Sequence, residues 1–110
     1  MRYYMIDELS FLERDNLESY LKRTLRPGGL DGVFFLEVAP DLLGEAQRGH
    51  EKCGPFYFSV ILESSSIKFE LLVRSASTMH CSCIAQATRA QREFVFDYVD
   101  TMLAEELIKA

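Results

Sequence analysis

Two neighbouring segments with alternating apolar side chains constrain the fold of this chain most strongly. Pro55–Leu62 and Ile67–Val73 are joined by the polar loop Glu63–Ser66. Period-two alternation on both sides of a four-residue loop is typical of an antiparallel hairpin. A register error of one residue would turn a whole apolar row toward water. The pattern therefore predicts that Leu62 lies opposite Ile67.

This register predicts how the rest of the sheet is built. It pairs three further apolar positions across the hairpin, namely Val60 with Phe69, Phe58 with Leu71 and Phe56 with Val73. A third strand would follow if Val73 lies opposite Met79, and Cys81 and Cys83 would then continue the inner apolar row. The segment Gly32–Ala39 alternates in the same way and predicts a further strand.

Helical periodicity appears near both ends of the chain. Leucines and Tyr20 form a stripe over residues 7–25, and Pro27-Gly28-Gly29 ends that helix. Thr88 and Gln91 have the spacing of a capping box, in which each side chain bonds a backbone N–H at the helix start. An apolar stripe from Phe94 to Leu107 follows.

Together these elements predict a single α+β domain over residues 1–110. We expect a two-layer fold with a four-stranded, mainly antiparallel sheet and with the N- and C-terminal helices packed on one face. A chain of 110 residues with 48% hydrophobic residues is long enough to form a hydrophobic core without disulfides or metals.

Charge and cysteine content narrow the function classes. Seventeen acidic against twelve basic residues give a net charge of −5, which argues against nucleic acid as a partner. Asp7 interrupts the N-terminus before a secretory signal can form, and no apolar run reaches the roughly 20 residues of a membrane span. Three cysteines are an odd number and do not suit a secreted disulfide framework. We therefore expect a cytoplasmic protein without a membrane partner.

One group of residues has the donor types of a zinc site. His50 and Cys53 are three residues apart, and Cys81 and Cys83 are two residues apart. The predicted strand places Cys53 about 16 Å from Cys81 along the sheet, whereas zinc thiolates lie within roughly 4 Å of one another. The preferred interpretation is that the thiols act as small buried hydrophobic groups. We accordingly expect no metal and no cofactor.

The outer face of the predicted sheet offers a candidate ligand-binding group. The register makes Glu70 a diagonal neighbour of His80, so that the carboxylate can orient the imidazole, with Tyr57 beside them. No nucleophile elbow or oxyanion loop accompanies them. A solvated sheet face accounts for the same residues, and we expect no catalysis.

The same outer face also carries apolar side chains outside the helix-covered core. These predicted interface residues are Phe35, Tyr57, Ile61, Leu72 and Ile84. A monomer rarely leaves such a patch in water, so we expect a homodimer. The favoured hypothesis is a non-catalytic protein-interaction module that self-associates through this face. The alternatives are a small enzyme or ligand-binding domain that uses Glu70, His80 and Tyr57, and a zinc-binding domain that uses His50, Cys53, Cys81 and Cys83.

Overall fold

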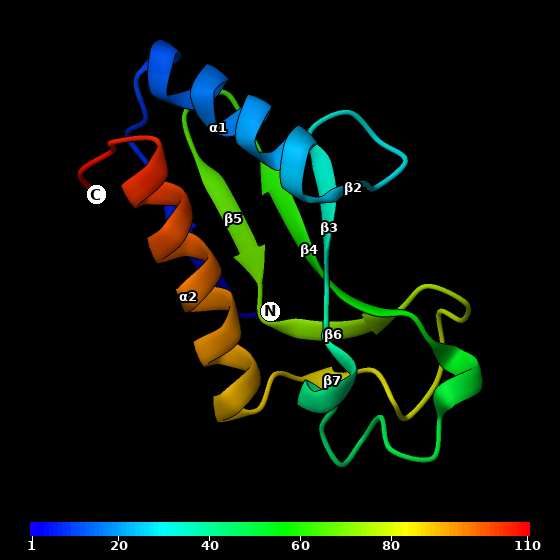
Figure 1. Cartoon of the computed structure of the whole chain (residues 1–110). Helices are drawn as coiled ribbons and strands as arrows, with labels where there is room; N and C mark the ends of the chain where they lie inside the picture. The colour runs from blue at the N-terminus through cyan, green and yellow to red at the C-terminus, as the bar shows by residue number, and fades with distance from the viewer.

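The computed structural model describes residues 1–110 and has an α+β fold (Figure 1). Its two α-helices are α1 (Phe11–Thr24) and α2 (Arg89–Glu105). The strands are β1 (Tyr3–Ile6), β2 (Arg26–Pro27), β3 (Val33–Glu37), β4 (Phe56–Leu62), β5 (Ile67–Glu70), β6 (Leu72–Ser75) and β7 (Ala85–Gln86). Two short 3-10 helices, η1 (Pro40–Leu42) and η2 (Glu51–Cys53), lie between β3 and β4.

The sheet is antiparallel and has seven strands in place of the four predicted. Its main order is β1-β5-β4-β3-β2, and β6 pairs with both β4 and β7. The prediction missed β1, β2 and β7 because strands of two to four residues are too short to show a clear alternation. The first predicted strand, β3, lies between β2 and β4.

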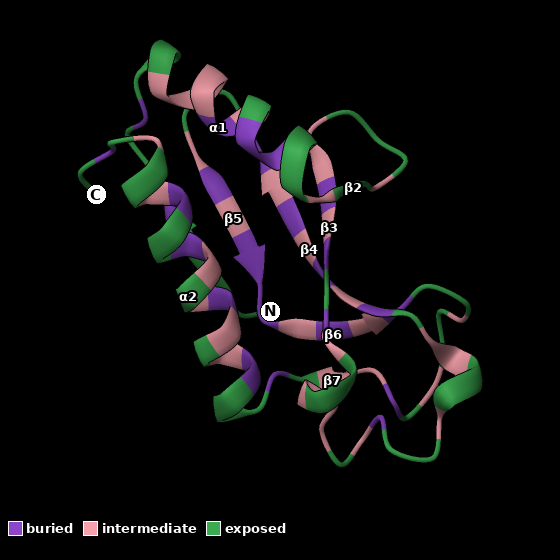
Figure 2. Ribbon diagram, viewed as in Figure 1, coloured by how far each residue is buried: buried purple, intermediate pink, exposed green.

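The predicted hairpin register is confirmed near the turn. Val60 pairs with Phe69 and Leu62 with Ile67, and the side chains of Val60, Phe69 and Ile67 are fully buried. Figure 2 shows buried positions alternating with half-buried ones along β4. The alternation in the sequence therefore placed this half of the sheet correctly.

Beyond Glu70 the predicted register is wrong because the chain bends at Leu71. Phe56 pairs with Ser75 and not with Val73, so two extra residues lie in the second arm of the hairpin. The Leu71 N–H donates to the Arg2 carbonyl, and the Leu71 carbonyl accepts from the Ala87 N–H. Figure 1 shows that β6 runs steeply across the direction of β5.

This bend also removes the predicted third strand. Val73 pairs with Ala85 and not with Met79, and residues 76–84 form a loop that leads into the short strand β7. Met79, which was expected on the inner row, is 84% exposed. The period-two spacing of Met79, Cys81, Cys83 and Ala85 is therefore no evidence of a strand here.

Both helices begin with a capping box. Helix α2 begins after Thr88, whose side chain accepts from the Gln91 N–H while the Gln91 side chain accepts from the Thr88 N–H, as predicted. Helix α1 begins at Phe11, later than expected, because Ser10 and Glu13 form the same arrangement.

One hydrophobic cluster of 22 buried residues joins the sheet to both helices. Leu17 and Leu21 of α1 are fully buried in it, as are Val95 and Met102 of α2. The placement of both helices on one face of the sheet stays a prediction. Neither helix has the length and apolar character needed to cross a membrane.

Candidate metal centre

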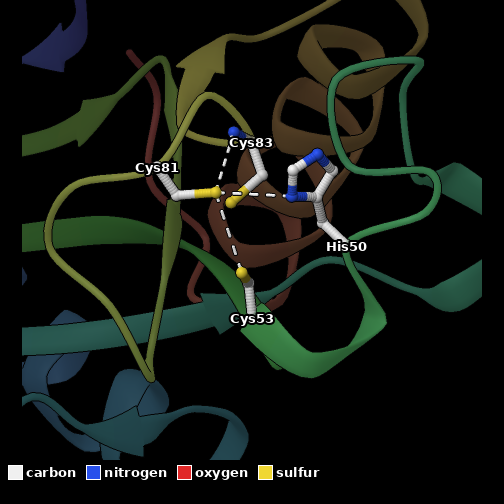
Figure 3. A group of neighbouring side chains, drawn as sticks. All are labelled: His50, Cys53, Cys81 and Cys83. Carbon is white, nitrogen blue, oxygen red and sulfur yellow. Dashed lines mark hydrogen bonds between the residues drawn. The ribbon is translucent and has the colours of Figure 1, made fainter.

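The side chains of His50, Cys53, Cys81 and Cys83 converge at one place (Figure 3). One ligand atom from each, an imidazole nitrogen or a thiol sulfur, lies within 4.8 Å of all the others. The group contains every cysteine of the chain and one of its two histidines. Thiolate and imidazole are the donors that proteins use for tetrahedral zinc.

Two of the separations between donor atoms match the edges of a tetrahedron around a single ion. The Sγ atoms of Cys53 and Cys81 are 3.7 Å apart, and Cys81 Sγ is 3.4 Å from Nδ1 of His50. Zinc–sulfur bonds of about 2.3 Å place two sulfurs roughly 3.8 Å apart in a regular tetrahedron, and a sulfur–nitrogen edge is slightly shorter. The side chains of Cys53, Cys81 and His50 therefore have the spacing of zinc ligands.

Two separate segments supply the donors. His50 immediately precedes η2 and Cys53 is its last residue, and the Cys53 N–H donates to the His50 carbonyl at 2.8 Å. Cys81 and Cys83 lie in a turn that is closed by the Ile84 N–H on the Cys81 carbonyl at 3.0 Å. The Cys83 N–H points at Cys81 Sγ at 3.4 Å, and such an N–H bond stabilises a thiolate ligand.

Ser75 holds the two segments together on one side of the cluster. Its hydroxyl donates to the Cys53 carbonyl and accepts from the N–H groups of Ser77 and Thr78. Ser77 Oγ donates in turn to the Lys52 carbonyl at 3.2 Å. The start of the loop at residues 76–84 is thus fixed to η2 by side chains of the protein alone.

The surroundings of Cys81 favour its thiolate form. Hydrogen bonds from the side chain and then the backbone N–H of Cys83 lower the pKa of the Cys81 thiol to about 6. Burial raises the pKa of Cys83 to about 12, and the nearby sulfurs of Cys81 and Cys53 add to that increase. A bound cation would favour the thiolate form of its sulfur ligands.

The predicted placement of Cys53 far from Cys81 along a strand is wrong, and the reason is the bend at Leu71. Cys81 is not part of a strand, so the separation of about 16 Å along a strand does not apply. Cys83 is fully buried, whereas Cys53 and Cys81 are half-buried. A usable signal was present in the sequence, because His50-x-x-Cys53 lies between Gly49 and Gly54 and Cys81-x-Cys83 follows a segment rich in Ser and Thr.

Of the predicted group Tyr57, Glu70 and His80, the first two lie on strands and His80 lies in a loop. The Glu70 carboxylate is buried and binds the Arg74 guanidinium through both oxygens, and this contact raises the pKa of Arg74. His80 is exposed in the loop at residues 76–84, so its predicted cross-strand position beside Glu70 is wrong. Ligand binding by these three residues stays a prediction.

The five predicted interface residues are all half-buried. The rings of Phe35 and Tyr57 stack with centroids 3.9 Å apart. Tyr57 and Ile84 line one open pocket of about 300 Å³, and Ile84 also packs against the hydrophobic core. Ile61 lies on β4 and Leu72 on β6.

No protein-family model matches this chain, and no curated protein or solved structure matches it.

Proposed function

We propose that this protein is a zinc-binding domain with a structural Cys3His centre formed by His50, Cys53, Cys81 and Cys83. The observation that carries the proposal is the convergence of the four donor atoms within 4.8 Å of one another. Acidic surface groups often cluster without binding a metal, but the donors here are three thiols and an imidazole, which are the residue types of structural zinc sites.

Two features of the donor set favour zinc. Tetrahedral sites of sulfur and nitrogen donors select zinc or iron–sulfur clusters among biological metals. The separations of 3.7 Å and 3.4 Å are close to the ligand–ligand distances expected around one zinc ion. Four protein donors also leave no open position for water or substrate, so the site is structural and not catalytic.

The location of the centre explains what zinc would contribute. The loop at residues 76–84 has no regular secondary structure, and residues 43–50 before η2 have none either. The four ligands connect these two segments, which lie at one end of the molecule (Figure 1). Zinc binding would therefore add a cross-link between these segments to the hydrogen bonds that Ser75 and Ser77 already form.

Metal analysis of the protein purified under reducing conditions tests this proposal. We expect one zinc ion per chain, and after exchange for Co²⁺ we expect the visible absorption of a tetrahedral thiolate complex. His50→Ala should abolish or strongly weaken binding, whereas His80→Ala, the matched control at the other histidine, should bind as the wild type does. Folded protein that takes up no zinc or Co²⁺, or equal effects of the two substitutions, would overturn the proposal.

We propose self-association through the outer sheet face as a second, separate property. It is supported by the stacked Phe35 and Tyr57 rings, which lie on neighbouring strands together with the half-buried Ile61. Apolar groups in this arrangement favour an isologous contact with a second copy of the chain.

The solution mass tests this second proposal. We expect a dimer for the wild type and a folded monomer for Ile61→Glu. Leu30→Glu introduces the same charge at an exposed position outside the sheet and should remain dimeric. A monomeric wild-type protein at high concentration would contradict the proposal without affecting the zinc site.

A further inference from the structure

Gln47 is a buried amide that contacts both ligand-bearing segments of the metal centre. Its side chain is 1% exposed. The Nε2 group donates to the Cys83 carbonyl at 2.7 Å, while the backbone carbonyl of Gln47 accepts from the His50 N–H at 3.0 Å. One residue therefore holds the backbone next to a ligand in each of two segments that are far apart in the sequence.

A second buried amide extends this contact to helix α2. Gln91, also 1% exposed, donates from Nε2 to Gln47 Oε1 at 3.1 Å and to the Leu42 carbonyl at 2.9 Å. Its Oε1 accepts from the Thr88 N–H at 2.9 Å and so closes the capping box. A continuous chain of hydrogen bonds thus runs from Cys83 through Gln47 and Gln91 to the first turn of α2.

The amide pair has little freedom to rearrange. Gln47 Oε1 accepts a further bond from the Gly44 N–H at 2.8 Å, and a Cβ atom at Gly44 would lie 3.1 Å from Gln47 Oε1 and 3.2 Å from Gln91 Nε2. Every buried side-chain polar atom of the protein has a hydrogen-bond partner. If the Cys83 turn moved away, Gln47 Nε2 would lose its partner in a place that water does not reach, which is costly.

We propose that Gln47 is a positioning residue that couples zinc binding to the first turn of α2 through Gln91. This inference rests on the proposed zinc centre. When zinc holds the Cys83 turn, Gln47 keeps its bond to that turn, and the Gln91 amide stays aligned for the helix cap. Coupling between two sites is reciprocal, so the amide pair also raises the affinity for zinc.

Zinc affinity in Gln47→Met provides the first test, since methionine has a similar length but cannot form the hydrogen bonds. Removal of a partner in the outer shell of a metal site typically weakens metal binding about 10- to 100-fold, and we expect a loss in this range in a competition assay against a chromophoric chelator. Val99→Ala is the matched control, because Val99 is buried in α2 but makes no polar contact with the network. It should lower stability and leave zinc affinity unchanged.

Hydrogen exchange along α2 provides the second test, and it has a readout that a purely structural role would not change. In the wild type, zinc should slow exchange at the Gln91 and Arg92 amides, which bond to Thr88. Amides near the C-terminal end of the helix, such as Glu106, should not respond. In Gln47→Met saturated with zinc, the protection at Gln91 and Arg92 should be lost.

The outcomes separate this inference from the proposed function. Wild-type zinc affinity in Gln47→Met, or exchange at Gln91 and Arg92 that does not respond to zinc, would overturn the coupling and leave the zinc site intact. A wild-type protein that binds no zinc would overturn both. If Gln47→Met does not fold, Gly44→Ala tests the same coupling, because its methyl group presses on the amide pair without removing a polar group; wild-type zinc affinity and exchange in that variant would overturn the inference.

Discussion

Gly32 adopts a backbone conformation that no other residue type fits at this position. Its φ is +79°, and an added Cβ would lie 2.7 Å from the Leu62 carbonyl oxygen. The Gly32 carbonyl also accepts from the Leu62 N–H at 2.7 Å. The close approach of these two backbones sets where β3 begins beside β4, so both the missing side chain and the positive φ are required.

Substitution of Gly32 tests this requirement. We expect Gly32→Ala to lower the free energy of unfolding by about 1–3 kcal/mol through backbone strain, with a further loss from the contact with Leu62. The matched control is Gly29→Ala, because Gly29 also has a positive φ of +88° but has open space around it. Urea unfolding of both variants should show the larger loss at Gly32, and equal losses would contradict the steric argument.

At the scale of single elements, the cap of helix α2 contributes to stability through two reciprocal hydrogen bonds. Thr88 Oγ1 accepts from the Gln91 N–H at 3.2 Å, which satisfies one of the N–H groups that a helix start leaves unpaired. The Gln91 side chain of this cap is also hydrogen-bonded to Gln47, which in turn donates to the Cys83 carbonyl.

Removal of the cap should therefore destabilise the fold. We expect Thr88→Ala to lower the free energy of unfolding by about 1 kcal/mol, the usual effect of losing an N-cap side chain. Thr101→Ala is the control, because Thr101 is an exposed residue in the middle of the same helix and alanine has the higher helix propensity. Thermal unfolding that ranks the two variants in the opposite order would contradict the role of the cap.

Burial of Tyr98, which faces helix α1, makes the fold sensitive to alkaline pH. Tyr98 OH of α2 lies 2.6 Å from Thr24 Oγ1 of α1, and burial raises the pKa of Tyr98 to about 12. An unfolded chain releases this proton near pH 10. As pH rises from about 10 to 12, the unfolded state loses a proton that the native state retains, so stability falls across this window.

Tyr98→Phe should reduce that loss. We expect the variant to lose less stability than the wild type when the pH is raised from neutral into this window. The measurement is the urea midpoint of both proteins at neutral and alkaline pH, and the comparison at neutral pH corrects for the lost hydrogen bond. Identical pH slopes for the two proteins would show that Tyr98 does not ionise in the way described.

At the scale of the whole molecule, the hydrophobic core and the proposed metal centre connect different sets of elements, and Cys83 belongs to both. The core cluster joins both helices to the strands, whereas the ligands connect η2 to the loop at residues 76–84. Removal of zinc should therefore loosen η2 and the loop at residues 76–84 first. Most of the contacts between the helices and the strands should stay intact.

Limited proteolysis distinguishes these regions. With zinc bound, we expect slow tryptic cleavage after Arg48 and Lys52, which are exposed but lie beside the ligands His50 and Cys53. A chelator should accelerate cleavage at these two sites. Cleavage after Lys109, near the C-terminus, is the internal control and should not change, and uniform acceleration at all sites would instead indicate global unfolding.

Patterns within short segments were enough to predict several elements correctly. The hairpin register at Val60 and Phe69 follows from alternation on both sides of a short loop, and the start of α2 follows from the spacing of Thr88 and Gln91. In each case the interacting groups are close in sequence, so their spacing alone specifies the geometry. The sequence also contained all four metal donors and both of their local spacings.

Contacts between distant segments decided the features that local patterns did not predict. The bend at Leu71 depends on backbone bonds to Arg2 and Ala87, which lie 69 and 16 residues away, and no local pattern indicates them. That bend turns the segment with Cys81 and Cys83 from a predicted strand into a loop, and the loop brings its sulfurs to η2. The donors were visible in the sequence, but their convergence depends on backbone hydrogen bonds that form only when the whole chain has folded.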